Sequence, residues 1–187
     1  MKYLYLTLIL ATMNSFGQLV KVDYADGNQK LEGFFAKAQK ANPKKIGVIV
    51  LPAWMGVDAH AKESAENLSK LGYHAFVADI YGVGNNPKNT GEAGKNAGFY
   101  KNNPAEYQKR IQLAIDQLVK AGADKNQIAV IGYCFGGTGA IEAARGNLNV
   151  KGVVSFHGGL GKAANSPTNE IKAKVLVDRK STRLNSS

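Results

Sequence analysis

Cysteine is almost absent from this chain, since Cys134 is the only one among 187 residues. A single thiol forms no internal disulfide, which excludes a small fold held together by disulfides. His, Cys, Asp and Glu nowhere gather at the spacing of metal ligands, so we expect neither a metal site nor a cofactor. No apolar run approaches the ~20 residues of a membrane-spanning helix, so no stable membrane span is expected.

Acidic residues are also scarce, with 14 Asp and Glu against 24 Lys and Arg and a formal net charge of +10. The positive charges are scattered, and no aromatic residues are interleaved with them to stack on bases. This distribution is typical of a solvated basic surface, so we expect no nucleic-acid partner. Hydrophobic residues make up 44% of the chain, enough for one domain with a core, and nothing indicates an oligomeric state.

The N-terminus indicates export. A positively charged start, an apolar stretch over residues 3–13 and a small-x-small site at 15–17 form the pattern of a signal peptide. We therefore expect residues 1–17 to be removed and the mature protein to be periplasmic or extracellular. The alternative is a buried N-terminal strand. In an oxidising compartment, the unpaired Cys134 would be a reactive or intermolecular thiol.

The rest of the chain alternates strand and helix patterns. Strands are predicted as a hairpin within 18–36, then over 46–51, 73–78, 127–131, 150–156 and from 174. Helices are predicted after a cap at Asp58, with Ala61, Ala65, Leu68 and Leu71 on one face, from a cap at Asn103 followed by Pro104 to Gly122, and over 138–145. Residues 79–103 show little periodicity and are expected to be a loop excursion over the carboxyl edge of the sheet. Short links between these elements predict parallel βαβ units, and hence one doubly wound α/β domain over 18–177.

The segment around Cys134 has the layout of a nucleophile elbow. An apolar strand leads into Gly132-Tyr133-Cys134-Phe135-Gly136-Gly137, and small residues typical of a helix follow. Glycines two residues to either side leave room for a strained turn, and a helix starting at Cys134 would favour the thiolate. The plainer interpretation is a small buried core cysteine.

The same residues resemble the dienelactone hydrolase family of the α/β-hydrolase fold. The resemblance rests on the elbow, on Asp79-Ile80-Tyr81-Gly82 and on residues 155–160, and it runs from about Leu31 to Val177. It implies a mostly parallel, doubly wound sheet and a Cys-His-Asp triad that cleaves small esters or lactones through an acyl-enzyme.

Carried over residue by residue, the resemblance makes Cys134 the nucleophile and the backbone N–H groups of Trp54 and Phe135 the oxyanion-hole donors. Tyr81 and Tyr133 are candidates for the wall of the substrate pocket. Two departures bear on the substrate: Ala53 stands where many members carry a Glu near the resting thiol, and Val83 stands where dienelactone-cleaving members carry an Arg. Either the thiol is activated by a His and the helix alone, or the substrate range differs.

No histidine matches the family's base. His60 is expected on an exposed helix face, His74 as a structural residue, and His157 as a pocket candidate rather than a base. Asp178 precedes the loop where the family's acid belongs, so we do not assign it as the triad acid. The polar residues 178–187 look like a non-native tail, and we expect the family's last strands and helices, with the triad His and Asp, to be missing from this chain.

The leading hypothesis is therefore an exported hydrolase that acts on a small-molecule ester or lactone, with this chain nearly inactive. The alternative is a non-catalytic α/β-hydrolase-fold binding protein or thiol sensor that uses Cys134 as a ligand or redox site. A structural fragment without function is a third possibility.

Overall fold

A seven-stranded sheet forms the centre of the molecule in the computed structural model, which describes residues 19–164, 166 and 169–179. The predicted signal peptide, 1–17, and most of the predicted tail, 178–187, lie outside the described residues. The strands are β1 (Val20–Asp26), β2 (Gln29–Ala36), β3 (Gly47–Leu51), β4 (His74–Val77), β5 (Ile128–Tyr133), β6 (Gly152–Phe156) and β7 (Lys174–Asp178). The helices are α1 (Ala59–Lys70), α2 (Thr90–Asn102), α3 (Pro104–Lys120) and α4 (Phe135–Arg145).

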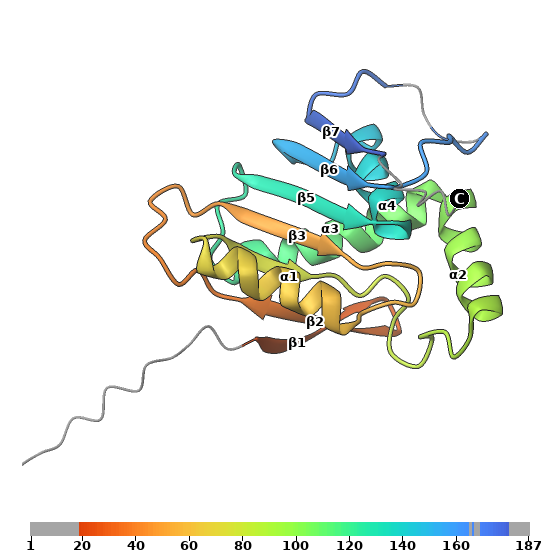
Figure 1. Ribbon diagram of the computed structural model, residues 1–187, viewed down its shortest axis with the longest axis horizontal. Coiled ribbons are helices and arrows are strands. Elements are labelled where there is room, and N and C mark those ends of the chain that lie inside the picture. The colour runs from red at the N-terminus through yellow and green to blue at the C-terminus, as the bar shows by residue number, and fades with distance from the viewer. Residues whose placement is uncertain (1–18, 165, 167–168, 180–187) are drawn as a thin grey trace, which may run out of the picture.

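The strand order across the sheet is β1-β2-β4-β3-β5-β6-β7 (Figure 1). The pairs of β1 with β2 and of β2 with β4 are antiparallel, and the other four are parallel. The carboxyl ends of β3, β4, β5, β6 and β7 therefore meet at one edge. The prediction of a mostly parallel, doubly wound α/β sheet is confirmed.

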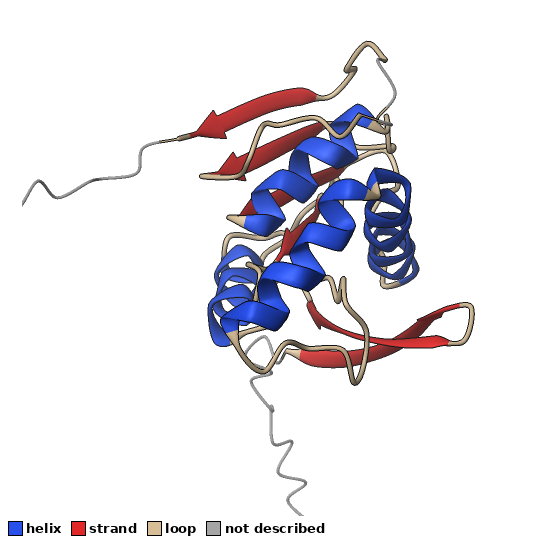
Figure 2. Cartoon of the chain, turned by 90° about the vertical axis from the view of Figure 1, so that its right-hand side faces the viewer, coloured by secondary structure: helices blue, strands red, loops and turns tan. Residues whose placement is uncertain are grey.

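Helices lie on both sides of the sheet (Figures 1 and 2). On one face, Ala61 and Ala65 of α1 pack against Val50 and Val77. On the other face, α3 and α4 cover the larger core, which includes Ile49, Phe76, Ile111, Leu118, Val130 and Ala140. β3 is buried along its whole length, as its continuous apolar run predicts.

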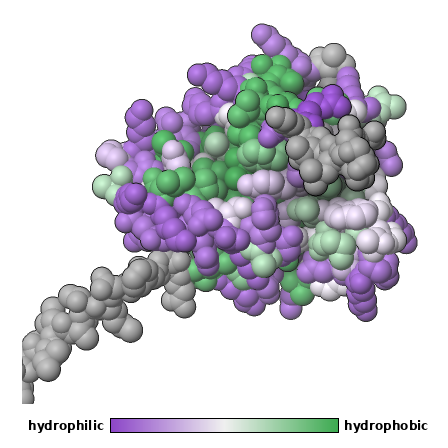
Figure 3. Space-filling view, in the orientation of Figure 1, coloured by the Kyte–Doolittle hydropathy of each residue, from purple (hydrophilic) through white to green (hydrophobic). Residues whose placement is uncertain are grey.

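The α1 side of the sheet is less well covered over its last three strands. Ile131, Val154 and Leu176 occupy matching positions on β5, β6 and β7, so their side chains form one row on the same face. Leu176 is 62% exposed, and Figure 3 shows hydrophobic surface over these strands. Of the described strands, β7 is at this edge of the sheet and β1 at the other.

The structure corrects the loop prediction for 79–103, because α2 occupies half of that segment. Asn89 caps the helix by accepting a hydrogen bond from the Glu92 N–H, and the Glu92 carboxylate accepts one from the Lys88 N–H, in a reciprocal cap. Ala93, Ala97 and Tyr100 are the buried residues of this helix. Two of these three are alanines, and three glycines lie in the same helix, so no hydrophobic period stands out.

Two smaller expectations fail at helix ends. Leu71 lies past the end of α1 and is 66% exposed, so it does not belong to the buried face of that helix; Ser69 is buried there instead. The Asn103 side chain does not cap α3 and instead donates a hydrogen bond to the Phe99 carbonyl at the end of α2. The cap predicted at Asp58 is confirmed, because its carboxylate accepts the Ala61 N–H at 2.8 Å.

Candidate active site

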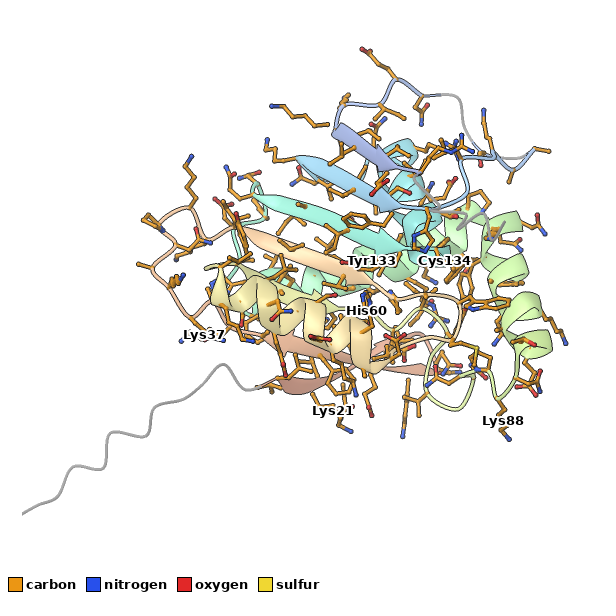
Figure 4. The ribbon with its side chains drawn as sticks, viewed as in Figure 1. Lys21, Lys37, His60, Lys88, Tyr133 and Cys134 are labelled. Carbon is orange, nitrogen blue, oxygen red and sulfur yellow. The ribbon has the colours of Figure 1, made fainter. Side chains whose placement is uncertain are left out.

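Cys134 stands at the sharp turn between β5 and α4, at the carboxyl edge of the sheet (Figure 4). Its backbone angles are φ +55° and ψ −112°, a conformation that costs a non-glycine residue of the order of 1–3 kcal/mol. The Cys134 N–H donates to the Phe156 carbonyl at 3.0 Å, and the Cys134 carbonyl accepts the Thr138 N–H at 3.2 Å. These two bonds tie the strained residue to β6 on one side and to the first turn of α4 on the other.

The flanking glycines are required by close backbone contacts. A Cβ at Gly132 would lie 2.8 Å from the Gly137 nitrogen and would overlap the Gly136 carbonyl. A Cβ at Gly136 would lie 2.6 Å from the Pro52 carbonyl oxygen and would overlap that of Leu51. The second contact brings the start of α4 against the end of β3, where the Trp54 loop begins.

The two predicted oxyanion donors therefore lie on neighbouring segments of the same edge. Phe135 is the first residue of α4, where a backbone N–H has no partner within its helix. Trp54 lies in the loop after β3 with its side chain 38% exposed. Within the described part of the chain, neither of these N–H groups donates a backbone hydrogen bond.

Tyr81 links the two donor residues. Its hydroxyl donates to the Trp54 carbonyl at 2.9 Å, and its ring stacks on Phe135 with centroids 5.5 Å apart. Burial, followed by the negative charges that Tyr100 and Cys134 can carry, raises the pKa of Tyr81 well above its usual value. Tyr81 is expected from the sequence in the pocket wall, but its hydrogen bond to the loop has no signal in the sequence.

Tyr133 lies in an aromatic group on the α1 side of the sheet. Its ring stacks on Phe156 at 4.8 Å, and the edge of the His60 ring meets it at 4.6 Å (Figure 4). His60 is exposed, as expected, but its contact with the residue before Cys134 is new. No local pattern predicts it, because α1 and β5 meet only through the fold.

The other two histidines, His74 and His157, form contacts away from Cys134. His74 accepts a hydrogen bond from the Ala38 N–H at 3.4 Å and stacks on Phe35, in line with a structural residue. The side chain of His157 is exposed, and its backbone N–H donates to the Asp178 carbonyl. Across the described residues, no histidine side chain forms a hydrogen bond with Cys134, and no cluster of His, Cys, Asp and Glu could hold a metal ion.

A groove of about 540 Å³ begins at Tyr81 and runs between α2 and the loop before it. Phe99 and Tyr100 of α2 line it, together with amide and charged side chains, namely those of Asn85, Asn86, Lys88, Glu92, Lys95 and Asn96. Cys134 does not line this groove, whereas Tyr81 does. Because the sequence predicts a loop where α2 lies, the Phe99-Tyr100 pair that lines this groove is not among the predicted site residues.

The comparisons with known proteins agree with this geometry. The sequence matches the model of the Dienelactone hydrolase family over residues 31–179. The chain belongs to the dienelactone hydrolase family.

No described helix is both long and apolar enough to cross a bilayer.

Two solved structures are similar in both sequence and fold. One is named m3DLH, with 31% identity and a TM-score of 0.79, and the other is a dienelactone hydrolase-like promiscuous phosphotriesterase from metagenomic libraries, with 33% identity and a TM-score of 0.78. Each similarity covers 86% of this chain and 67% of the solved one. An acylaminoacyl peptidase, 15% identical with a TM-score of 0.63, shares the fold alone.

A curated protein of Bradyrhizobium sp. is 28% identical over 112 residues and is named "Probable 2-oxo-3-(5-oxofuran-2-ylidene)propanoate lactonase". The matched region is 59% of this chain and 45% of that relative, so the chain aligns with less than half of the relative's length. Family membership and the two similar solved structures support the α/β-hydrolase fold for this chain.

Proposed function

We propose that this chain binds small carboxylic esters or lactones and is acylated by them on Cys134. The observation that supports this most is the strained backbone of Cys134 at the start of α4, together with the Trp54 and Phe135 N–H groups, which donate no backbone hydrogen bond among the described residues. A buried structural cysteine needs no such conformation, whereas a nucleophile must be lifted above the sheet in this way.

The reaction follows from these parts. The Cys134 sulfur, as thiolate, bonds to the ester carbonyl carbon, and the carbonyl oxygen gains the negative charge that the Trp54 and Phe135 N–H groups stabilise. The carbon–oxygen bond to the alcohol then breaks, the alkoxide takes a proton, and a thioester remains on Cys134. Attack by water on that thioester would release the acid and restore the thiol.

The second half of this reaction needs a general base that places water on the thioester. Since no described histidine hydrogen-bonds Cys134, we propose that acylation is faster than deacylation in this chain and that the acyl-enzyme accumulates. The groove beside Tyr81 is the proposed place for the part of the substrate that extends away from the reacting carbonyl.

The test is a 4-nitrophenyl ester, whose leaving group is good enough to depart without help from an acid. We expect a burst of one nitrophenolate per chain and one acyl group on the Cys134 peptide by mass spectrometry. Cys134→Ser keeps the size of the side chain and should lose the burst, because a hydroxyl without a base is a poor nucleophile. A burst that persists in Cys134→Ser would contradict the proposal.

The second candidate is a binding protein or thiol sensor on the same fold. The absence of a histidine hydrogen bond to Cys134 among the described residues favours it. Such a protein would leave the ester intact, while the thiol would still react with peroxide or a disulfide.

The test of the proposed hydrolase extends to a 4-nitrophenyl phosphotriester, because one structural relative is named as a phosphotriesterase.

A further inference from the structure

The loop that carries the Trp54 N–H has few internal restraints. Its single described backbone hydrogen bond runs from the Gly56 N–H to the Ala53 carbonyl at 3.0 Å, closing one turn. The Trp54 side chain is partly exposed and forms no described aromatic contact. This bond orients the peptide plane of the Trp54 N–H within the turn, but the placement of the turn relative to Phe135 must be fixed from outside the loop.

Tyr81 is the outside contact, and it is itself held on several sides. Its side chain is 3% exposed, stacked on Phe135 and packed at 5.8 Å from Tyr100. The backbone beside it is fixed by Asp79, whose carboxylate accepts the Gly82 N–H at 2.8 Å. A hydroxyl on so rigid a ring can hold the Trp54 carbonyl in one direction.

We propose that Tyr81 is a positioning residue for the oxyanion hole, acting through its hydrogen bond to the Trp54 carbonyl and its stacking on Phe135. The inference rests on the proposed acylation of Cys134 and goes beyond it by assigning the orientation of the hole to one side chain. The Trp54 N–H and carbonyl lie in adjacent peptide planes of one turn, which the Gly56 N–H closes by donating to the Ala53 carbonyl, so holding the Trp54 carbonyl anchors that turn and the N–H with it. Stacking on Phe135 ties the second donor to the same ring.

Tyr81→Phe tests this, because it removes the hydroxyl and keeps the ring. Loss of a whole oxyanion donor costs ~10²–10³ in rate, and a donor that is present but loosely held should cost less, about tenfold to a hundredfold. We expect that fall in the rate constant for acylation by a 4-nitrophenyl ester, with little change in the ester concentration that half-saturates it. Alkylation of Cys134 by iodoacetamide forms no oxyanion, so its rate should stay at the wild-type value.

Tyr24→Phe is the matched control. Tyr24 is also a mostly buried tyrosine with a hydrogen-bonded hydroxyl, which accepts the Asp79 N–H at 3.1 Å and has no described contact with Trp54. Its loss should lower stability without slowing acylation. Equal acylation rates in Tyr81→Phe and wild type would overturn the inference, and so would an equal slowing of acylation and alkylation, which would place the effect on the thiol.

A second measurement uses fluorescence and needs no reaction. Trp54 is the only tryptophan in the chain, so tryptophan fluorescence reports on this loop alone. If Tyr81 restrains the loop, the fluorescence anisotropy of Trp54 should show more local rotation in Tyr81→Phe than in wild type or Tyr24→Phe. Unchanged anisotropy would contradict the positioning role. A wild-type chain that is never acylated would refute the proposed function alone, and the anisotropy would still decide the role of Tyr81.

Discussion

Gly132→Ala is the sharpest perturbation of the elbow. The new Cβ would overlap the Gly136 carbonyl and lie 2.8 Å from the Gly137 nitrogen. Both obstacles are backbone atoms in the first turn of α4, which is buried over nearly its whole length, so no flexible side chain can move aside. The helix start must shift away from β5, and Cys134 must shift with it.

The structure sets the size of the effect. Overpacking a well-packed interior costs about 1–3 kcal/mol, and a clash of backbone with backbone belongs near the upper end, at about 3 kcal/mol. A displacement of ~1 Å at a reacting centre costs ~10² in rate. We therefore expect Gly132→Ala to lose about 3 kcal/mol in the free energy of unfolding and about a hundredfold in the rate of Cys134 acylation.

Gly94→Ala makes the same chemical change where the structure leaves room. No atom lies within 4 Å of a Cβ at Gly94, which is inside α2, so alanine should stabilise the chain by about 0.5–1 kcal/mol. Urea unfolding followed by circular dichroism measures both variants. If Gly132→Ala unfolds and is acylated like the wild type, the tight elbow described here is wrong.

Two further predictions concern buried carboxylates. Asp26→Asn should lower the free energy of unfolding by about 3 kcal/mol, because the Asp26 carboxylate lies 3.0 Å from Nε of the buried Arg110 and 2.7 Å from Nζ of Lys109. Asp23 is exposed, so Asp23→Asn should change the free energy of unfolding by at most about 0.5 kcal/mol. Similar losses in the two variants would contradict the pairing of Asp26 with Arg110 and Lys109. Burial raises the pKa of Asp79 above the ordinary 3.8, so the folded chain binds this proton more tightly than the unfolded chain, and stability from this group falls as the pH rises from about 3.8 through the raised pKa. The stability difference between Asp79→Asn and wild type should therefore change with pH over that window in urea titrations, and a constant difference would refute the shift.

Local sequence was enough to predict the parts of the fold that local chemistry determines. The buried strand β3 is a continuous apolar run, and the elbow at Cys134 is recognisable because only glycine fits at Gly132 and Gly136. The cap at Asp58 follows from a short polar side chain before a helix. In each case the determining residues lie within a few positions of one another.

The features that the sequence did not predict depend on small residues or on contacts between distant parts of the chain. α2 was missed because alanine and glycine, rather than large apolar residues, fill its interior positions. The bond from Tyr81 to Trp54 joins residues 27 apart, and the contact of His60 with Tyr133 joins a helix to a strand from different βαβ units. Such contacts exist only once the sheet has assembled, so no pattern along the chain contains them.

The most direct test of the account is the mass of the intact protein after brief exposure to a 4-nitrophenyl ester. We predict one added acyl group, located by peptide mapping on Cys134 and absent from Cys134→Ser. Acylation confined to lysines, or an unchanged mass while the thiol stays free to react with iodoacetamide, would contradict the claim that Cys134 is an acyl-accepting nucleophile.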